Sequence, residues 1–290
     1  MAPITDYAVV LLTQGRRPDD LQRAIASARG QTGVTTDIVV VGNGWEPVGL
    51  PEGVRGLWLP ENLGIPAGRN AGVAATTAPM LFFLDDDAWL PEPDTLHRIS
   101  QMFADRPRIG LVQPRVTDPD SDADPTRWIP RMRKGDPRHS SAVFSVWEGA
   151  TAIPREVFEC AGGWPDPFFY AHEGIELAWR VWDCGRVVWY AGDIVANHPV
   201  IDPRRHGEYY RLNARNRVWL ARRNLPWPMG VPYIGTWTAV QRLRSRDDPQ
   251  AWSAWWDGFR EGWREDPGPR QPIHWSTVWE MTRFGRPPVV

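Results

Sequence analysis

The chain has 290 residues, enough for one large α/β domain with a smaller appendage, and its 33 basic and 35 acidic side chains give a formal net charge of -2. This balance excludes a general electrostatic attraction to nucleic acid, and no segment approaches the roughly 20 consecutive apolar residues of a membrane helix. The two cysteines, Cys160 and Cys184, have no CxxC spacing and indicate neither a disulfide scaffold nor a zinc site, so we predict a soluble protein of the reducing cytoplasm.

Short β-rich runs alternate with helix-like runs through the first half of the chain. The pattern predicts strands at 7–12, 37–41, 54–59, 80–84 and 109–113, and helices at 18–28, from Pro66 onward and at 94–104. Such alternation favours parallel strands with crossover helices. Because the strands are almost continuously apolar, we expect a sheet that is covered on both faces.

The second half is less regular. Residues 117–140 are too rich in Pro, Asp and Arg for a core element and are predicted to form a long surface loop, with a lid as one hypothesis. A helix is expected near 154–161, another from Glu173 onward, and a strand at 186–191.

The last quarter differs in composition, since half of the 18 tryptophans lie beyond residue 218. We expect helices with aromatic faces there. Two interpretations stay open: the tryptophans pack an appendage against the main sheet, or they form an acceptor platform or a contact with a membrane surface.

Three adjacent aspartates, Asp85, Asp86 and Asp87, follow directly on the apolar strand at 80–84. Buried like charges need a partner that offsets their desolvation, and ligands of open parallel sheets bind beyond the carboxyl ends of strands. In an extended chain Asp85 and Asp87 point the same way, which suits a shared Mg²⁺ or Mn²⁺ ion and substrate phosphates. The alternative is a solvated loop with Asx turns.

Two carboxylates and an imidazole downstream are further candidates. Glu173 and Glu176 neighbour each other in the first turn of a predicted helix, where the alternative is that Glu173 caps the helix and Glu176 pairs with Arg180. His198 follows a short strand and is either a structural imidazole or a metal ligand. No G-x-G-x-x-G or P-loop pattern occurs, which argues against Rossmann dehydrogenases and P-loop ATPases.

Six ordered segments between about residues 7 and 225 resemble the family 2 glycosyltransferases, inverting enzymes of GT-A fold that move a sugar from a nucleotide diphosphate to an acceptor. The segments are VVLLTQGRRPDDLQRAIASARGQ, DIVVVGNGW, LPENLGIPAGRNAGVAAT, FFLDDDAWL, WEGATAIPREVFECAGGWPDPFFYAHEGIELAWR and VVWYAGDIVANHP. The resemblance implies an α/β fold with a Rossmann-like, mostly parallel sheet flanked by helices. We expect a catalytic domain at 1–205, with a nucleotide-sugar half at about 1–115 and an acceptor half at about 140–205, and a Trp-rich helical extension at 206–290.

The resemblance also implies roles by position. Asp85 and Asp87 would be the outer members of a D-x-D motif that holds Mg²⁺ or Mn²⁺, with His198 as a further ligand. Glu173 is the first candidate for the catalytic base and Glu176 is the second. The donor nucleotide is expected to contact residues of four segments: Thr13, Gln14, Asn43, Asn62, Gly64, Arg69, Asn70, Asp85 and Asp86.

Two departures from the family pattern stand out. Many relatives have Asp after the second strand, where it reads the base, but Gly42 stands there in this chain. Relatives tend to have a second acid directly before the helix as catalytic base, but here Glu173 is followed by Gly174. The donor base and the identity of the catalytic base are therefore open.

We expect a metal-dependent inverting glycosyltransferase of the hexosyl- or deoxyhexosyltransferase class, with a UDP-, dTDP- or GDP-linked donor and a hydroxyl-bearing acceptor. The alternative is a degenerate domain that binds a nucleotide sugar without catalysis. A nucleotidyltransferase ranks lower, because LLTQGRRPDD is a poor imitation of the Gly-rich basic loop of such enzymes. No nucleic-acid partner and no transmembrane segment are expected, and a peripheral membrane contact stays open.

Overall fold

Eight strands form one mixed sheet in the computed structural model, which describes residues 5–121, 124–131, 133–200 and 208–288. Their order is β3-β2-β1-β4-β7-β5-β8-β6, and only β7 and β6 run antiparallel to their neighbours. The strands are β1 (Thr5–Thr13), β2 (Val34–Asn43), β3 (Val54–Leu59), β4 (Met80–Asp85), β5 (Ile109–Thr117), β6 (Ser141–Ala142), β7 (Ala150–Pro154) and β8 (Val187–Asn197). The predicted mostly parallel sheet is confirmed.

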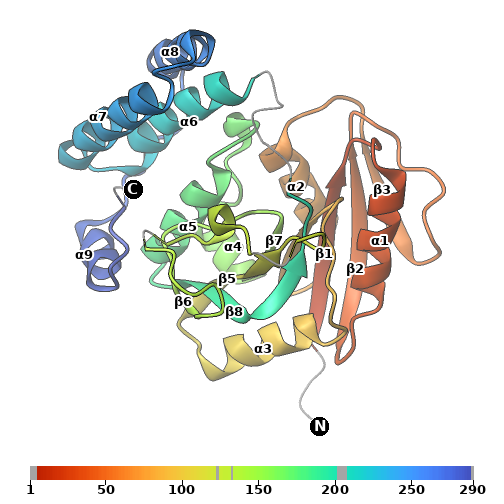
Figure 1. Ribbon diagram of the computed structural model, residues 1–290. Coiled ribbons are helices and arrows are strands. Elements are labelled where there is room, and N and C mark those ends of the chain that lie inside the picture. The colour runs from red at the N-terminus through yellow and green to blue at the C-terminus, as the bar shows by residue number, and fades with distance from the viewer. Residues whose placement is uncertain (1–4, 122–123, 132, 201–207, 289–290) are drawn as a thin grey trace.

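Helices cover both faces of this sheet (Figure 1), as the apolar strands predict. Along β1, Val9 and Leu11 join the core on the side of α1 and α3, whereas Val10 joins the core on the side of α2, α4 and α5. The helices of the sheet region are α1 (Pro18–Arg29), α2 (Ile65–Ala74), α3 (Thr95–Asp105), α4 (Arg155–Cys160) and α5 (Glu173–Asp183).

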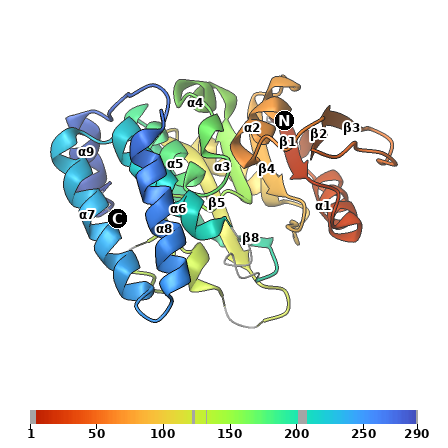
Figure 2. The same ribbon diagram turned by 90° about the horizontal axis from the view of Figure 1, so that it is seen from above.

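Four more helices follow and lie to one side of the sheet, beyond α5 (Figure 1). They are α6 (Tyr209–Asn224), α7 (Trp227–Arg244), α8 (Pro249–Arg264) and α9 (Trp275–Arg283). Seen from above, α7 and α8 lie beside α6 (Figure 2). The expected boundary between residues 205 and 206 lies outside the described residues and stays a prediction. No helix within the described ranges is long and apolar enough to cross a membrane.

Some tryptophans of this extension are buried and others are exposed. Trp219 is buried in a core that includes strands of the sheet, as one interpretation of the sequence requires, whereas Trp255 is buried but belongs to no core cluster of the sheet. In contrast, Trp279 is 67% exposed and Trp227 is 54% exposed. Packing alone therefore does not account for the aromatic content of this region.

The two cysteines form a disulfide in the structure, which contradicts the expectation drawn from their spacing. Cys160 is the last residue of α4, and Cys184 directly follows α5, 24 positions later. The folding of α4 against α5 brings them together, and no local sequence pattern signals such a contact. The cytoplasmic location stays a prediction. The cysteines no longer support a reducing environment, because they are paired in the structure.

Replacing both Cys160 and Cys184 by alanine is expected to lower the free energy of unfolding by about 3 kcal/mol, because the bridge closes a medium-length loop in the unfolded chain. Urea unfolding of the variant and of the parent protein, each with and without reductant, measures this. Reductant is expected to shift the midpoint of the parent only. Two titratable thiols in the denatured, unreduced parent would contradict the disulfide.

Candidate active site

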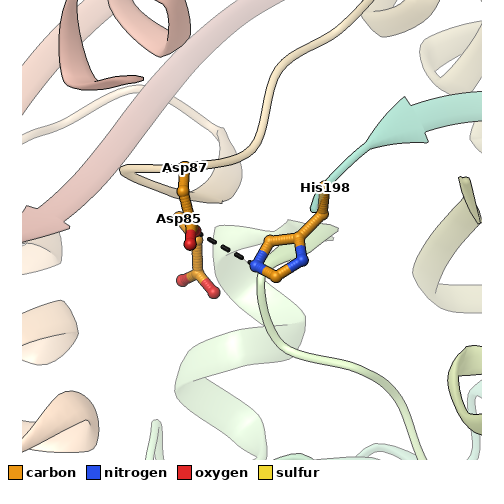
Figure 3. Close-up of side chains that lie close together, drawn as sticks. All are labelled: Asp85, Asp87 and His198. Atoms are coloured by element: carbon orange, nitrogen blue, oxygen red, sulfur yellow. Dashed lines mark ion pairs between the residues drawn. The ribbon is translucent and has the colours of Figure 1, made fainter. Parts of the chain in front are cut away.

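Strand ends bring the predicted metal ligands to one edge of the sheet. Asp85 ends β4 and pairs in register with Leu12 of the parallel strand β1, so the two strands end together. β8 runs parallel to β5, and both run in the direction of β4 because β7 is antiparallel to each of its neighbours. His198 follows the last residue of β8. In Figure 3, Asp85 and Asp87 point toward His198 across this edge.

These three side chains form a possible metal centre. One ligand atom from each of Asp85, Asp87 and His198 lies within 4.8 Å of the other two, and Nε2 of His198 is 3.1 Å from Oδ1 of Asp87. The buried Nδ1 of His198 has no hydrogen-bond partner among the described residues. Two carboxylates and an imidazole whose Nδ1 is held by no hydrogen bond in the described residues fit a divalent first-row transition-metal ion.

The loop at 117–140 supports His198. The backbone N–H of His198 donates to the carbonyl oxygen of Thr117 at 2.9 Å. The imidazole meets the rings of Trp128 and Trp147 edge-on, with centroids 5.1 and 4.8 Å away. Trp128 is buried, and its carbonyl oxygen accepts from Gln113 at 2.9 Å. The described part of this loop is irregular, as predicted, but it packs on the site at Trp128 rather than lying wholly at the surface.

The middle aspartate points away from the metal centre. Oγ1 of Thr13 donates to Oδ2 of Asp86 at 2.5 Å, and Arg17 forms ion pairs with both Asp86 and Asp87. Burial raises the pKa of Asp86 to about 6, although Arg17 and Thr13 act in the opposite direction. Thr13 and Asp86, both expected at the donor nucleotide, thus meet at the turn that follows β1.

A second guanidinium lies on the other side of the aspartates. Arg69, on α2, is 2% exposed, and its Nη2 donates to Oδ1 of Asp85 at 2.7 Å. Its buried Nη1 has no hydrogen-bond partner among the described residues. The positive charge that three adjacent aspartates require therefore comes partly from Arg17 and Arg69, and Arg69 keeps a donor for a further ligand.

Two neighbouring glutamates, the buried Glu173 and the half-buried Glu148, adjoin this cluster. Glu173 is 3% exposed, and its Oε2 has no hydrogen-bond partner among the described residues. Burial first, and the charge of Glu148 second, raise the pKa of Glu173 to about 8, against the effect of Arg69. Burial also raises the pKa of Glu148. Sequence reasoning missed Glu148, because a single acid in WEGATAI carries no spacing signal.

Glu148 explains the glycine that departs from the family pattern. Its Oε1 accepts from the backbone N–H of Gly174 at 2.7 Å. A Cβ atom at position 174 would lie 2.3 Å from that oxygen and 2.4 Å from the carbonyl oxygen of Val146. The space for a side chain at Gly174 is thus occupied, and a carboxylate from the segment before β7 lies in it.

The turn before Glu173 is strained and is held by the C-terminal extension. Phe169, Ala171 and His172 all have φ between 62° and 74°, an arrangement that is costly for residues other than glycine. Nδ2 of Asn216, a fully buried residue of α6, donates to three carbonyl oxygens of this turn, those of Phe168, Tyr170 and Ala171. The extension therefore fixes the backbone that presents Glu173.

Glu176, the second candidate base, lies in a different environment. Its carboxylate accepts from Arg223 at 2.7 to 3.1 Å and from Nδ2 of Asn224 at 2.7 Å. Both partners are on α6, and within the described residues the carboxylate of Glu176 has no hydrogen bond to the guanidinium of Arg180, the partner expected one turn away. The side-chain hydrogen bonds of Glu176 within these residues all join α5 to the extension.

Glu176→Ala is expected to lower the free energy of unfolding by about 3 to 5 kcal/mol, because it leaves the guanidinium of Arg223 without its partner. Chemical unfolding measures the loss, and Glu208→Ala, which removes an exposed ion pair with Arg211, is the matched control with little effect. Sugar transfer by the folded fraction is expected to persist. Loss of transfer in a stable Glu176→Gln protein would instead favour Glu176 as base.

Three of the remaining candidates for donor contact, Asn43, Asn62 and Gly64, hold the loop between β3 and α2. Nδ2 of Asn43 donates to Oδ1 of Asn62 at 2.9 Å and to the carbonyl oxygen of Gly64 at 3.0 Å, and its Oδ1 accepts from Leu63. A Cβ at Gly64 would lie 2.6 Å from the backbone of Phe169, and φ at Gly64 is 86°. Asn43, Asn62 and Gly64 thus lie together as a group, and the side-chain amide of Asn43 bonds to the other two residues. A donor contact stays a prediction for all three.

Asn70 and Gln14 differ from that group. Nδ2 of Asn70 donates to the carbonyl oxygen of Trp164 at 2.8 Å and to Asp166, which ties α2 to the segment that follows α4. Gln14 is exposed in the turn after β1. A donor contact remains a prediction for both residues.

Gly42 is also explained by packing. A Cβ at this position would lie 1.9 Å from the carbonyl oxygen of Trp45, so the chain has no room for the aspartate that relatives carry. The indole of Trp45 instead covers Gly15 in the turn after β1, where an added Cβ would be 2.4 Å from the ring. An aromatic ring thus adjoins the turn of Thr13, a feature that the sequence alone did not single out.

Residues 8–162 match the family described as Glycosyl transferase family 2, which is more than half of the chain. The chain belongs to this family. The matched segment of this family 2 glycosyltransferase includes Asp85, Asp87 and Glu148, whereas Glu173 and His198 lie beyond it. A search of curated proteins found no match to the family 2 chain.

Solved structures share its GT-A fold at low identity. GalNAc-T7 with UDP, GalNAc and Mn²⁺ is 15% identical with a TM-score of 0.62, and the match covers 91% of this chain but only 57% of that chain. TarS from S. aureus is 11% identical with a TM-score of 0.63, and the match covers 89% of this chain and 81% of that chain. The mannosyltransferase PcManGT from Pyrobaculum calidifontis, with GDP-Man and Mn²⁺, is 16% identical with a TM-score of 0.58. The match covers 97% of this chain and 80% of that chain.

Proposed function

We propose that this family 2 protein is a metal-dependent inverting glycosyltransferase, which moves a hexosyl or deoxyhexosyl group from a nucleoside diphosphate to an acceptor hydroxyl. One observation carries the proposal: the metal centre and a buried carboxyl group with an unpartnered oxygen adjoin each other. The charge of Asp85 acts on Glu173, and Arg69 acts on both Glu173 and Asp85. Donor and acceptor chemistry can therefore meet at one point.

The donor side is built around Asp85, Asp87 and His198, which would hold the metal. An imidazole ligand favours Mn²⁺ over Mg²⁺, because Mg²⁺ prefers a shell of oxygen atoms. When bound, such an ion stabilises negative charge on a departing diphosphate. The unpartnered Nη1 of Arg69 is a donor for the same phosphate oxygens, and the half-buried ring of Trp45 is an aromatic surface on which a nucleobase can stack.

On the acceptor side, Glu173 is the proposed general base. Its carboxylate takes the proton of the acceptor hydroxyl while that oxygen forms a bond to the anomeric carbon. The bond between the anomeric carbon and the diphosphate oxygen breaks, and its electron pair leaves with the nucleoside diphosphate. A single displacement from the opposite face inverts the anomeric centre.

Glu148 is proposed to replace the second acid of the family pattern. Its carboxylate lies where a side chain at Gly174 would begin, and its charge helps to raise the pKa of Glu173. A base whose pKa lies near the working pH takes up a proton more effectively than an unperturbed carboxylate. Glu148 would thus tune Glu173 from the segment that precedes β7.

The test is a panel of UDP-, dTDP- and GDP-sugars with Mn²⁺ or Mg²⁺. Ligands that bind only the folded state raise the melting temperature, so the correct donor is expected to do so in a metal-dependent way. Release of free nucleoside diphosphate by slow donor hydrolysis, and the anomeric configuration of a transferred sugar by NMR, report the chemistry. No metal-dependent shift with any donor would refute the proposal.

The second candidate is a nucleotide-sugar binding protein without catalysis. Gly42 and Gly174 favour it, because both family positions lack their usual acids. This candidate predicts a metal-dependent thermal shift without hydrolysis of any bound donor. The presence of Glu148 in the space at Gly174 favours the enzyme instead.

A further inference from the structure

A second concave site lies in the C-terminal extension, between α7 and α8 and above α6. It is a cavity of about 620 Å³. Ala221 and Arg222 of α6 border it, and its two walls consist of one face of α7 and one face of α8. The lining residues of α7 are Trp227, Gly230, Val231, Ile234, Gly235, Thr238, Ala239 and Arg242, and those of α8 are Trp252, Trp256, Phe259 and Trp263.

The α8 wall is a row of stacked rings. The centroids of Trp252 and Trp256 are 5.7 Å apart, and those of Trp256 and Phe259 are 4.9 Å apart with planes only 6° from parallel. The opposite face of α8 approaches α6 at Gly258 and Gly262, where an added Cβ would lie within 3 Å of the α6 backbone. Glycines thus pack α8 closely on α6, and the aromatic residues are left to line the cavity.

The α7 wall is low and apolar. A Cβ added at Gly235 would meet nothing within 4 Å, so open space lies beside this residue. Val231 is 69% exposed. A surface helix usually directs its apolar side chains to a core, and an exposed apolar wall facing a row of aromatic rings is typical of a binding surface.

The chemistry of the lining selects the kind of ligand. The hydroxyl of Thr238 already donates to the carbonyl oxygen of Ile234 at 2.8 Å. A sugar or a nucleotide needs polar partners for its hydroxyl groups, and this lining offers almost none outside its two arginines. The volume is that of a small-molecule pocket rather than of a protein-docking surface. An aliphatic chain meets both conditions.

Each end of the cavity carries an arginine, and the two arginines differ in their partners. At one end Arg222 donates to the carbonyl oxygens of Gly262 and Glu265, so its guanidinium serves the end of α8. At the other end Arg242 lies over the ring of Trp252 at 5.4 Å and forms no ion pair with any carboxylate of the described residues. An anionic group is therefore complementary to the Arg242 end.

We propose that this cavity binds the aliphatic chain of an anionic amphiphile, with its acidic head group at Arg242. The inference does not depend on the proposed transferase activity, because it rests on the extension alone. Its measurement is likewise independent of sugar transfer.

The probe is a series of alkyl phosphates, from hexyl to dodecyl, titrated below their micellar concentrations and followed by tryptophan fluorescence and calorimetry. Each added methylene is expected to tighten binding about fourfold until the cavity is filled. Gly235→Phe places a ring in this open space, where an added Cβ meets nothing within 4 Å, and is expected to abolish binding. Thr236→Phe is the matched control, because this exposed neighbour does not line the cavity, and it is expected to bind normally.

A second variant tests the head group. Arg242→Gln is expected to weaken dodecyl phosphate binding about tenfold while leaving the affinity for dodecanol unchanged, and Arg246→Gln is the control outside the cavity. Absence of saturable binding to the parent protein overturns the proposal. Equal binding by Gly235→Phe also overturns it, as does a dimer that Gly235→Phe dissociates while alkyl phosphates fail to bind, since the cavity would then be an interface between copies.

Discussion

Asp87→Ala is expected to lower kcat/KM for sugar transfer at least about 10³-fold, because the variant removes a carboxylate of the metal centre that also contacts His198. Stabilisation of charge by a bound divalent ion is worth several kcal/mol, which corresponds to such a factor. Initial rates at saturating acceptor, over a range of Mn²⁺ concentrations, measure the loss. Calorimetric titration of Mn²⁺ in the presence of nucleoside diphosphate is expected to show binding to the parent only.

The control for Asp87→Ala is Asp20→Ala, which removes a carboxylate from an exposed ion pair with Arg23 on α1. It is expected to retain full activity and metal binding. Arg17 keeps Asp86 as a partner in Asp87→Ala, so the variant is expected to fold. Unchanged transfer by folded Asp87→Ala, or full activity of the parent in a chelator, would contradict the assigned metal centre.

Glu173→Gln is expected to reduce kcat by about 10²- to 10⁴-fold with little change in donor affinity, because an amide cannot accept the acceptor proton. The activity of the parent is expected to rise with pH through about 8, since the base must lose its proton and burial raises its pKa to about 8. Steady-state rates between pH 6 and pH 9 measure this rise. The residual rate of Glu173→Gln is expected to lack it.

Glu148→Gln separates tuning from catalysis. Removing the charge of Glu148 is expected to lower the pKa of Glu173, so the rise in activity moves to lower pH while transfer persists. A pH profile of Glu148→Gln that matches the parent would contradict the tuning role. Full activity of Glu173→Gln would contradict its role as base and would direct attention to Glu148 itself.

Stability gives an independent check on Glu173. A carboxyl whose folded pKa is raised binds a proton in the folded state that the unfolded chain has released, so the free energy of unfolding falls as pH rises from about 4.5 to about 8. Glu173→Gln is expected to remove this contribution and to be relatively more stable above pH 8. Chemical unfolding at several pH values measures the difference.

Much of the donor half could be predicted from the sequence, because its information is local. Unbroken apolar runs specify strands such as β4, and a carboxylate directly after a strand must lie at the carboxyl edge of the sheet. The grouping of Asp85 with Asp87 follows from the same strand end. His198 was grouped with them only through the family resemblance, and the structure brings it there because β8 runs in the direction of β4 and ends at the same edge.

The sequence by itself determined the parallel strands, the helices between them and the aspartate edge, since periodicity and strand ends are properties of neighbouring residues. Tertiary structure alone decided which groups from distant segments fill the same space. Glu148 lies at Gly174 because β7 is inserted beside β4, Glu176 bonds to Arg223 because α6 packs on α5, and Cys160 meets Cys184 at the ends of two helices. Contacts of this kind depend on packing across the fold, and spacing along the chain carries no record of them.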